Sequence, residues 1–142
     1  MASTIAARVV PVKVKPIDPA NRPIVERYLQ VWTPTIMLLS PEGQLYHEWN
    51  GYLPPDLYVP QLVFGLGKAA VKRDRLDEAA GCFDEVIARY PTSDVAPDAC
   101  YWAAVARYKR SHEGEDLLGG WRKLQSRYPT SIARIKQSFT EG

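Results

Sequence analysis

The sequence predicts an α/β unit over residues 1–60 joined to an all-α unit over residues 61–142. Nine of the twelve prolines lie at or before Pro60, among apolar runs of strand length in the order β-α-β-β-α. The second unit has apolar residues at helical spacing and a five-residue motif that occurs twice. These observations favour a small sheet with helices, followed by helical hairpins.

The first predicted element is a strand over residues 10–14. Valines at 10, 12 and 14 alternate with Pro11 and Lys13, and this period of two is typical of a strand with one buried face. Pro11 argues against a fully paired position at that point, because proline has no N–H to donate.

The elements that follow are a helix, a hairpin of two strands and a second helix. Residues 18–30 begin with Asp-Pro and then place apolar residues at helical spacing, so we expect a short helix. The apolar run at residues 35–39 predicts a strand covered on both faces. A Ser-Pro-Glu-Gly turn leads to a returning strand at residues 45–49, and the next helix begins after Pro54 and Pro55 and continues to about residue 73.

The motifs around this hairpin resemble the C-terminal half of the thioredoxin fold. They are Thr-Pro-Thr at residues 33–35 before an apolar strand, Pro-Glu-Gly at 41–43, a second strand, Gly-Tyr at 51–52 and an amphipathic helix. The resemblance covers roughly residues 9–70. It implies that the bond between Thr33 and Pro34 is cis and that Thr33 offers its backbone to a bound extended peptide. The family's first half, with two opening strands and the CxxC motif, has no counterpart here, so the unit is predicted to be an incomplete thioredoxin-like domain.

The second unit contains an internal repeat. Arg-Tyr-Pro-Thr-Ser at residues 89–93 recurs at residues 127–131, and the offset of 38 lies in the range of stacked helical hairpins. Aligning the two motifs places Phe83 over Trp121 and Val86 over Leu124, so apolar positions repeat together with the loop. Each copy is predicted to be helix, turn, helix and Tyr-Pro, and a short closing helix is expected over residues 131–139.

These hairpins resemble the tetratricopeptide repeat (TPR), in which a small residue on each helix lets the pair approach closely. Gly67 and Ala79 match those positions in the first hairpin. In the second hairpin Val105 and Leu117 stand where small residues are expected, although Ala104 and the pair at 119–120 offer close packing nearby. Residues 90–99 especially resemble repeats of bacterial envelope-assembly proteins.

The nucleophilic and titratable candidates are few. Cys82 and Cys100 are the only thiols, and neither lies in a CxxC motif or beside a basic cluster, so we expect both to be packed helix residues. His47 and His112 are candidate bases, but each lacks a neighbouring histidine or carboxylate pair, which favours surface histidines that only form hydrogen bonds. We therefore expect no catalytic residues, no cofactor and no metal site.

Two sets of side chains on the second unit are candidates for recognition. Basic residues that could contact phosphates or an acidic peptide are interspersed with acids, so a solvated helix face is the better interpretation: Arg107, Lys109, Arg110, Arg122, Lys123 and Arg127. Aromatic residues at helical spacing are expected to be mostly core, with a recognition surface as the alternative: Tyr101, Trp102, Tyr108 and Trp121. Tyr101, Tyr108 and Arg107 are the predicted lining of a peptide groove.

Net charge, apolar stretches and cysteine content limit the kinds of partner and the location that we expect for this protein. Eighteen basic and sixteen acidic residues give a net charge of +2, which does not support nucleic-acid binding. No apolar stretch approaches the roughly 20 residues of a membrane helix, and the first residues do not have the pattern of a signal peptide. Two cysteines make no disulfide scaffold, so we expect a soluble cytoplasmic protein.

The predicted function is a non-catalytic protein-interaction module that binds a peptide or a partner protein. The alternative is the C-terminal portion of a thioredoxin-family thiol-disulfide oxidoreductase whose CxxC half is supplied upstream or by another chain. The strands that the thioredoxin fold would place beside residues 10–14 and 35–39 are missing, so strand edges stay unpaired. Two arrangements would pair them: the strand at residues 10–14 with the strand at 35–39 inside one molecule, or exchange of strands with a second copy. We expect the exchange, and hence a homo-oligomer.

Overall fold

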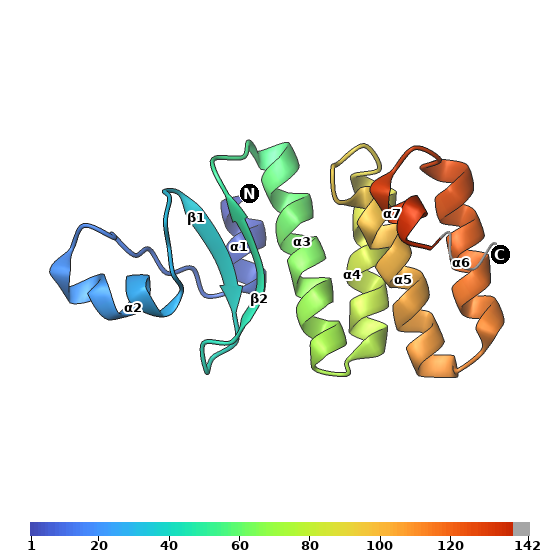
Figure 1. The fold of residues 1–142 in the computed structure, drawn as a ribbon, viewed down its shortest axis with the longest axis horizontal. Coiled ribbons are helices and arrows are strands. Elements are labelled where there is room, and N and C mark those ends of the chain that lie inside the picture. The colour runs from blue at the N-terminus through green and yellow to red at the C-terminus, as the bar shows by residue number, and fades with distance from the viewer. Residues whose placement is uncertain (138–142) are drawn as a thin grey trace.

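Four long helices stand side by side in chain order in the computed structural model, which describes residues 1–137 (Figure 1). Each is antiparallel to the next, and consecutive helices form the main contacts of the molecule. A short closing helix, α7, packs on α5 and α6. The bounds are α3 Pro55–Lys72, α4 Leu76–Arg89, α5 Ala96–Ser111, α6 Gly114–Arg127 and α7 Ile132–Lys136.

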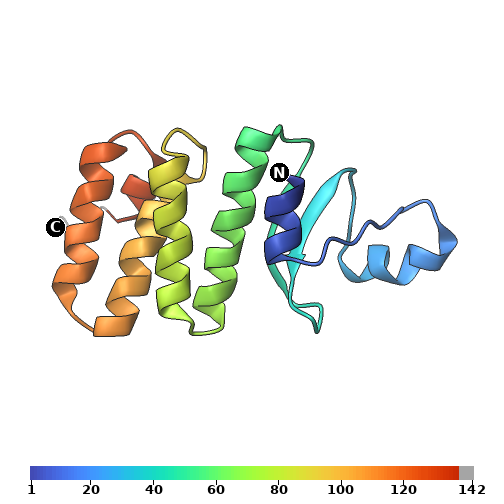
Figure 2. The same ribbon diagram turned by 180° about the vertical axis from the view of Figure 1, so that it is seen from behind.

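The N-terminal part contains short helices and a two-stranded antiparallel hairpin. The helices are α1 Ala2–Arg8, the 3-10 helix η1 Pro19–Asn21 and α2 Arg22–Arg27, and the strands of the hairpin are β1 Thr35–Leu39 and β2 Leu45–Asn50. The hairpin packs on α3, with α2 on the side away from the helices and α1 beside the hairpin near α3 (Figures 1 and 2). The structure is thus mostly helical, with one hairpin preceding the packed helices.

The hairpin register places one set of side chains on α3. Ile36 lies opposite Trp49, and Leu38 lies opposite His47. The Trp49 ring meets the Tyr58 ring of α3 edge to face, with centroids 5.1 Å apart. Because side chains alternate between the faces of a strand, these four residues share the face toward α3.

The hairpin turn is shaped by short-range hydrogen bonds. The Ser40 hydroxyl accepts bonds from the backbone N–H groups of Glu42 and Gln44. Gly43 has a φ of +83°, and the Tyr28 hydroxyl donates to its carbonyl at 2.7 Å. A side chain at position 43 would both strain this backbone and collide with Tyr28.

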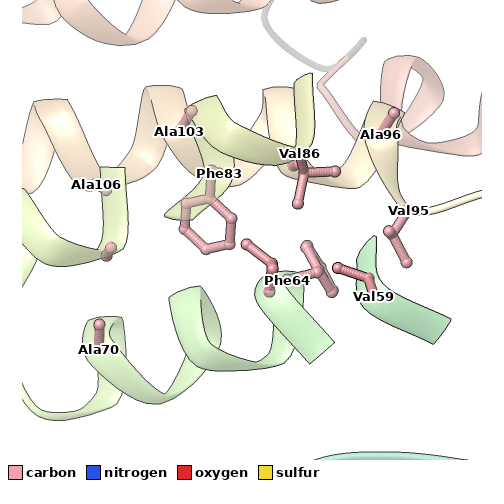
Figure 3. Close-up of a cluster of buried hydrophobic side chains, with 12 residues drawn as sticks. Val59, Phe64, Ala70, Phe83, Val86, Val95, Ala96, Ala103 and Ala106 are labelled. Atoms are coloured by element: carbon pink, nitrogen blue, oxygen red, sulfur yellow. The ribbon is translucent and has the colours of Figure 1, made fainter. Parts of the chain in front are cut away.

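The core lies between the helices. Figure 3 shows Phe64 and Val59 of α3 meeting Phe83 and Val86 of α4, with alanines of α5 closing the cluster. Gly67 allows this contact, because a Cβ there would lie 2.6 Å from the Phe83 ring. The close approach expected at Gly67 is therefore found, and Ala79 is fully buried in the same cluster.

The second hairpin uses the same close approach at a different place. A Cβ on Gly120 of α6 would lie 2.5 Å from the Cβ of Ala104 on α5, so these two residues bring the helices together. Gly119 meets only the side chains of Glu115 and Arg122. The helix continues through both glycines, and the close packing expected at this pair is found at Gly120.

The two Tyr-Pro loops are built alike. Tyr90 and Tyr128 each end a helix with φ of −132° and donate their N–H to the carbonyl four residues earlier, Val86 and Leu124. The Tyr128 hydroxyl also donates to the carbonyl of Pro91 at 2.8 Å, which ties the second loop to the first. The repeated motif thus marks a repeated helix end.

The strand predicted at residues 10–14 is wrong. These residues have no regular structure, and Val10 and Val12 are 88% and 80% exposed. Alternating valines indicate a strand only if another strand supplies hydrogen bonds, and within residues 1–137 none pairs with them. The segment contains Pro11 and precedes Pro16, which further weakens local strand formation.

Three other predictions are adjusted. The strand at residues 35–39 exists, but its residues are only partly covered, because the sheet ends at β1. The helix predicted over residues 18–30 is shorter, as Asp18 caps η1 and α2 ends at Arg27. The closing helix begins as expected after Ser131, while residues 138–139 lie outside the described part. None of the helices among residues 1–137 is both long and apolar enough to cross a membrane.

Candidate interaction surface

One edge of β1 carries backbone groups that point away from β2. The C=O of Pro34 accepts from the N–H of Gly51 at 2.8 Å, so these opposed residues are a hydrogen-bonded pair. Such pairs alternate along an antiparallel ladder, which directs the backbone groups of Ile36 and Leu38 toward β2. Those of Thr35 and Met37 point to the other edge, where no strand pairs within the described residues. We call this the open edge.

The predicted peptide-binding residues lie at the start of this edge. Thr33 and Pro34 are exposed and immediately precede β1, and the bond between them is cis, as expected. The Thr35 hydroxyl lies 2.7 Å from the carbonyl of Trp32, and the Gln30 side-chain amide donates to the same carbonyl. These bonds hold the loop that leads into the strand.

Exposed apolar side chains are concentrated in the segments before β1. No residue before Ser40 is buried, although this part of the chain contains many large apolar side chains. Trp32 is 68% exposed. Five other large apolar side chains in this part of the chain are more exposed still: Val10, Val12, Ile17, Leu29 and Val31. Exposed large apolar side chains gathered in one stretch of sequence mark it as a candidate interaction region.

No protein-family model, curated protein or solved structure matches this chain. The interpretation of the open edge therefore depends on the geometry of the edge itself.

A polar chain fixes the hairpin to the helices behind it. His47 Nε2 lies 2.8 Å from Gln61 Oε1 on α3, and the Gln61 amide donates to Asp94, in the loop between α4 and α5, at 2.9 Å. A Cβ on Gly65 would lie 2.9 Å from His47, whose ring also meets Phe64 edge to face. The hairpin that carries the open edge is thus bonded to α3 and, through Gln61, to the loop before α5.

This environment changes the proton affinity of His47. Burial lowers its pKa, and the nearby Lys68 charge acts in the same direction. The hydrogen bond to Gln61 opposes the shift, as do the charges of Asp94 and Glu48. Because the Gln61 amide donates to Asp94, its oxygen accepts from His47, which places the proton of neutral His47 on Nε2. His47 forms a hydrogen bond as predicted, but it is half-buried rather than a surface residue.

The residues predicted to line a helical groove meet different neighbours. Tyr101 stacks on the buried Trp121 with ring centroids 5.3 Å apart. Tyr108 is exposed and contacts His112, whose left-handed backbone ends α5. Arg107 pairs with Asp84 of α4 and lines a shallow hollow of about 650 Å³ against α6, which includes neither tyrosine.

Three of the six basic residues have acidic partners within the described part of the chain. Arg110 pairs with Asp77 at 2.7 Å, and Arg122 pairs with Glu115 within α6. Together with the pair of Arg107 and Asp84, these contacts agree with the interpretation as a solvated, charge-balanced helix face.

The two thiols have environments that disfavour the thiolate. Cys82 is half-buried on α4, Cys100 is buried on α5, and both are free. Burial raises the pKa of both thiols. No group of three or more His, Cys, Asp or Glu side chains among residues 1–137 is placed to hold a metal ion.

Sequence reasoning missed Gln61 and the apolar residues at 29–32. Gln61 is the one polar side chain in a run of buried residues from Val59 to Gly65. A lone polar residue within this apolar run was the sequence signal that could have identified it. Nothing local marks Asp94 as its partner, because they are 33 residues apart.

Proposed function

We propose that this chain is a non-catalytic protein-interaction module that binds an extended polypeptide segment along the open edge of β1. The observation that carries the proposal is the outward direction of the Thr35 and Met37 backbone groups on an edge strand. An extended segment that adds to such an edge forms main-chain hydrogen bonds, and its alternate side chains supply selectivity.

The surroundings of the edge support this function. Exposed apolar residues around Trp32 supply area that a bound segment covers, which is the larger source of affinity. In the thioredoxin family that residues 33–52 resemble, the residue before the cis proline offers its backbone to a peptide. Thr33 holds that position here. The observed order of hairpin and helix α3 agrees with this resemblance.

The helices act as the support in this proposal. The pairs α3–α4 and α5–α6, with glycine contacts at Gly67 and Gly120, are consistent with TPR-like hairpins. The polar chain from His47 through Gln61 to Asp94 joins the hairpin to this support. A rigid edge loses less conformational entropy when it binds than a mobile one.

The thiol environments favour this function over an oxidoreductase fragment. Thiol-disulfide exchange requires a thiolate of low pKa with a resolving thiol beside it. Cys82 and Cys100 lie on different helices, and burial raises the pKa of each.

A peptide display library selected on the immobilised chain tests the proposal. Met37→Pro removes one outward N–H but none that faces β2, a position that edge strands tolerate. Met37→Val keeps that N–H and is the matched control. We expect selected peptides to bind the wild type and Met37→Val alike, and to bind Met37→Pro about tenfold or more weakly.

Thr35→Pro serves as a second edge variant if Met37→Pro does not fold. Circular dichroism and thermal unfolding establish the fold of each variant. Selected peptides that bind all four proteins equally, or the absence of any enriched peptide, would overturn the proposal.

A further inference from the structure

We propose that residues 10–14 of a second copy of this chain occupy the open edge, so that two copies exchange these segments reciprocally. This inference rests on the proposed function, because it names the partner of the same edge.

The proposed donor is a segment that lies outside the helices and strands and has no backbone partners among the described residues. Val9 is extended, with φ of −142° and ψ of 160°. Backbone hydrogen bonds stop at Val9 and start again between Lys15 and Asp18, so among the described residues those at 10–14 form none. The valines at 10, 12 and 14 alternate with Pro11 and Lys13, which is the pattern of a strand. The segment therefore has the sequence pattern of a strand and a backbone that is free to pair with a neighbour.

Proline placement fixes which side of the donor can pair. The backbone groups of residues 10, 12 and 14 point to one side of an extended strand, and those of Pro11 and Lys13 point to the other. Pro11 has no N–H, so the side with the valines is the one that can form a complete ladder. Pairing through this side leaves Pro11 and Lys13 on the new outer edge.

The donor and the open edge match in length and register. Both contain five residues, and an antiparallel pairing centred on Met37 and Val12 also places Thr35 beside Val14. The side chains of two directly opposed residues lie on the same face of a sheet. The side chains of the valines therefore lie beside that of Met37, on the face away from α3. Val12, which is 80% exposed in the single chain, then gains an apolar neighbour.

The contacts of the single chain favour exchange over pairing within one copy. Arg8, just before the donor, forms an ion pair with Glu85 of α4 at 2.9 Å, and Tyr28, after it, is bonded to Gly43 of the hairpin turn. Between these contacts the chain runs across the hairpin rather than along β1 (Figures 1 and 2). These contacts keep residues 10–14 from lying along β1 of their own copy, but they do not keep them from the open edge of a second copy.

The exchange also predicts that assembly stops at two copies. Each copy gives one strand and receives one, so a twofold arrangement satisfies both edges. The outer side of each added strand carries Pro11 and Lys13, and proline and lysine are residues that protect edges from further pairing. A two-stranded sheet is marginal by itself, and exchange turns each hairpin into a three-stranded sheet.

Sedimentation equilibrium of the full chain tests this proposal with a matched pair of proline variants. Val12→Pro removes an N–H on the pairing side, whereas Lys13→Pro moves the same change to the outer side. Both positions are exposed in the single chain, so neither variant disturbs its fold. At micromolar concentration we expect the wild type and Lys13→Pro to have about twice the 16.0 kDa mass of one chain. Val12→Pro and Met37→Pro should raise the dimer dissociation constant about tenfold or more.

A wild type that stays at 16.0 kDa would overturn the inference. So would a Val12→Pro dimer as tight as the wild type, because two copies would then pair β1 with β1 directly. If the wild type is monomeric but library peptides bind in a Met37-dependent way, the inference fails while the proposed function stands. If Val12 and Met37 control a dimer that binds no library peptide, the inference stands and the broader peptide-binding function fails.

Discussion

Glycine at position 67 is the residue on which the first helical hairpin most directly depends. A Cβ at Gly67 would lie within 3 Å of the Phe83 ring, which is fully buried in the core. Gly67→Ala should therefore lower the free energy of unfolding by about 1–3 kcal/mol, as overpacking does. Urea unfolding measures this effect.

Gly81→Ala on α4 is the control for that substitution. A Cβ there meets nothing within 4 Å, so helix propensity alone should stabilise the protein by up to about 1 kcal/mol. Equal stability of the two variants would show that Gly67 is not needed for the contact with Phe83.

His47 gives the structure a pH dependence of known sign. Burial lowers its pKa below the ordinary 6.5, so the folded state favours the neutral ring. Its contribution to stability is complete above the pKa of the unfolded chain and is lost as the pH falls through the lower folded-state pKa. We expect thermal stability to fall across that range more steeply for the wild type than for His47→Gln.

His112→Asn is the matched variant, because it removes the exposed histidine at the end of α5. Comparison with this variant separates the effect of burying His47 from the effect of removing a histidine. If His47→Gln and the wild type lose stability in parallel below pH 6.5, the burial of His47 has no energetic effect.

At the scale of elements, the Tyr-Pro loops couple the two hairpins. Tyr128→Phe removes the hydroxyl that donates to Pro91 and should cost about 0.5–1.5 kcal/mol in chemical denaturation. Tyr90→Phe is the equivalent change in the first repeat, where the hydroxyl forms no hydrogen bond within the described residues, and it should have a smaller effect. A larger loss of stability for Tyr90→Phe than for Tyr128→Phe would contradict the coupling of the two hairpins.

The elements that the sequence predicted correctly are those with local signals. The hairpin and the helices have turn residues, proline starts and apolar spacing within one segment, and the repeat of residues 89–93 at 127–131 located the helix ends. The prediction of a strand at residues 10–14 was wrong, because a strand depends on a neighbouring strand that a local sequence pattern does not specify.

The candidate site was predictable only in part, for the same reason. Thr33 and Pro34 stood out by resemblance, and the open edge was expected from the missing strands. The chain from His47 through Gln61 to Asp94 joins three elements that are distant in sequence, so no local pattern identified it. Tyr101 and Tyr108 share a helical spacing, yet only Tyr101 is packed against a buried ring.

At the scale of the whole molecule, the isolated chain should have no dithiol reductase activity. Its two thiols lie in helices and have raised pKa values, so neither supplies a reactive thiolate near neutral pH. Insulin reduction with dithiothreitol is the assay, and a variant with both cysteines changed to serine is the control. A rate for the wild type above that control would contradict the non-catalytic function.

Amide hydrogen exchange along β1 tests the open edge most directly. In dilute single chains the amides of Ile36 and Leu38 should be protected by β2, while those of Thr35 and Met37 exchange rapidly. Addition of a synthetic peptide of residues 9–16 should slow exchange at Thr35 and Met37 and leave the other two amides unchanged. Protection of all four amides in the free chain, or rapid exchange at Met37 with saturating peptide, would contradict the account.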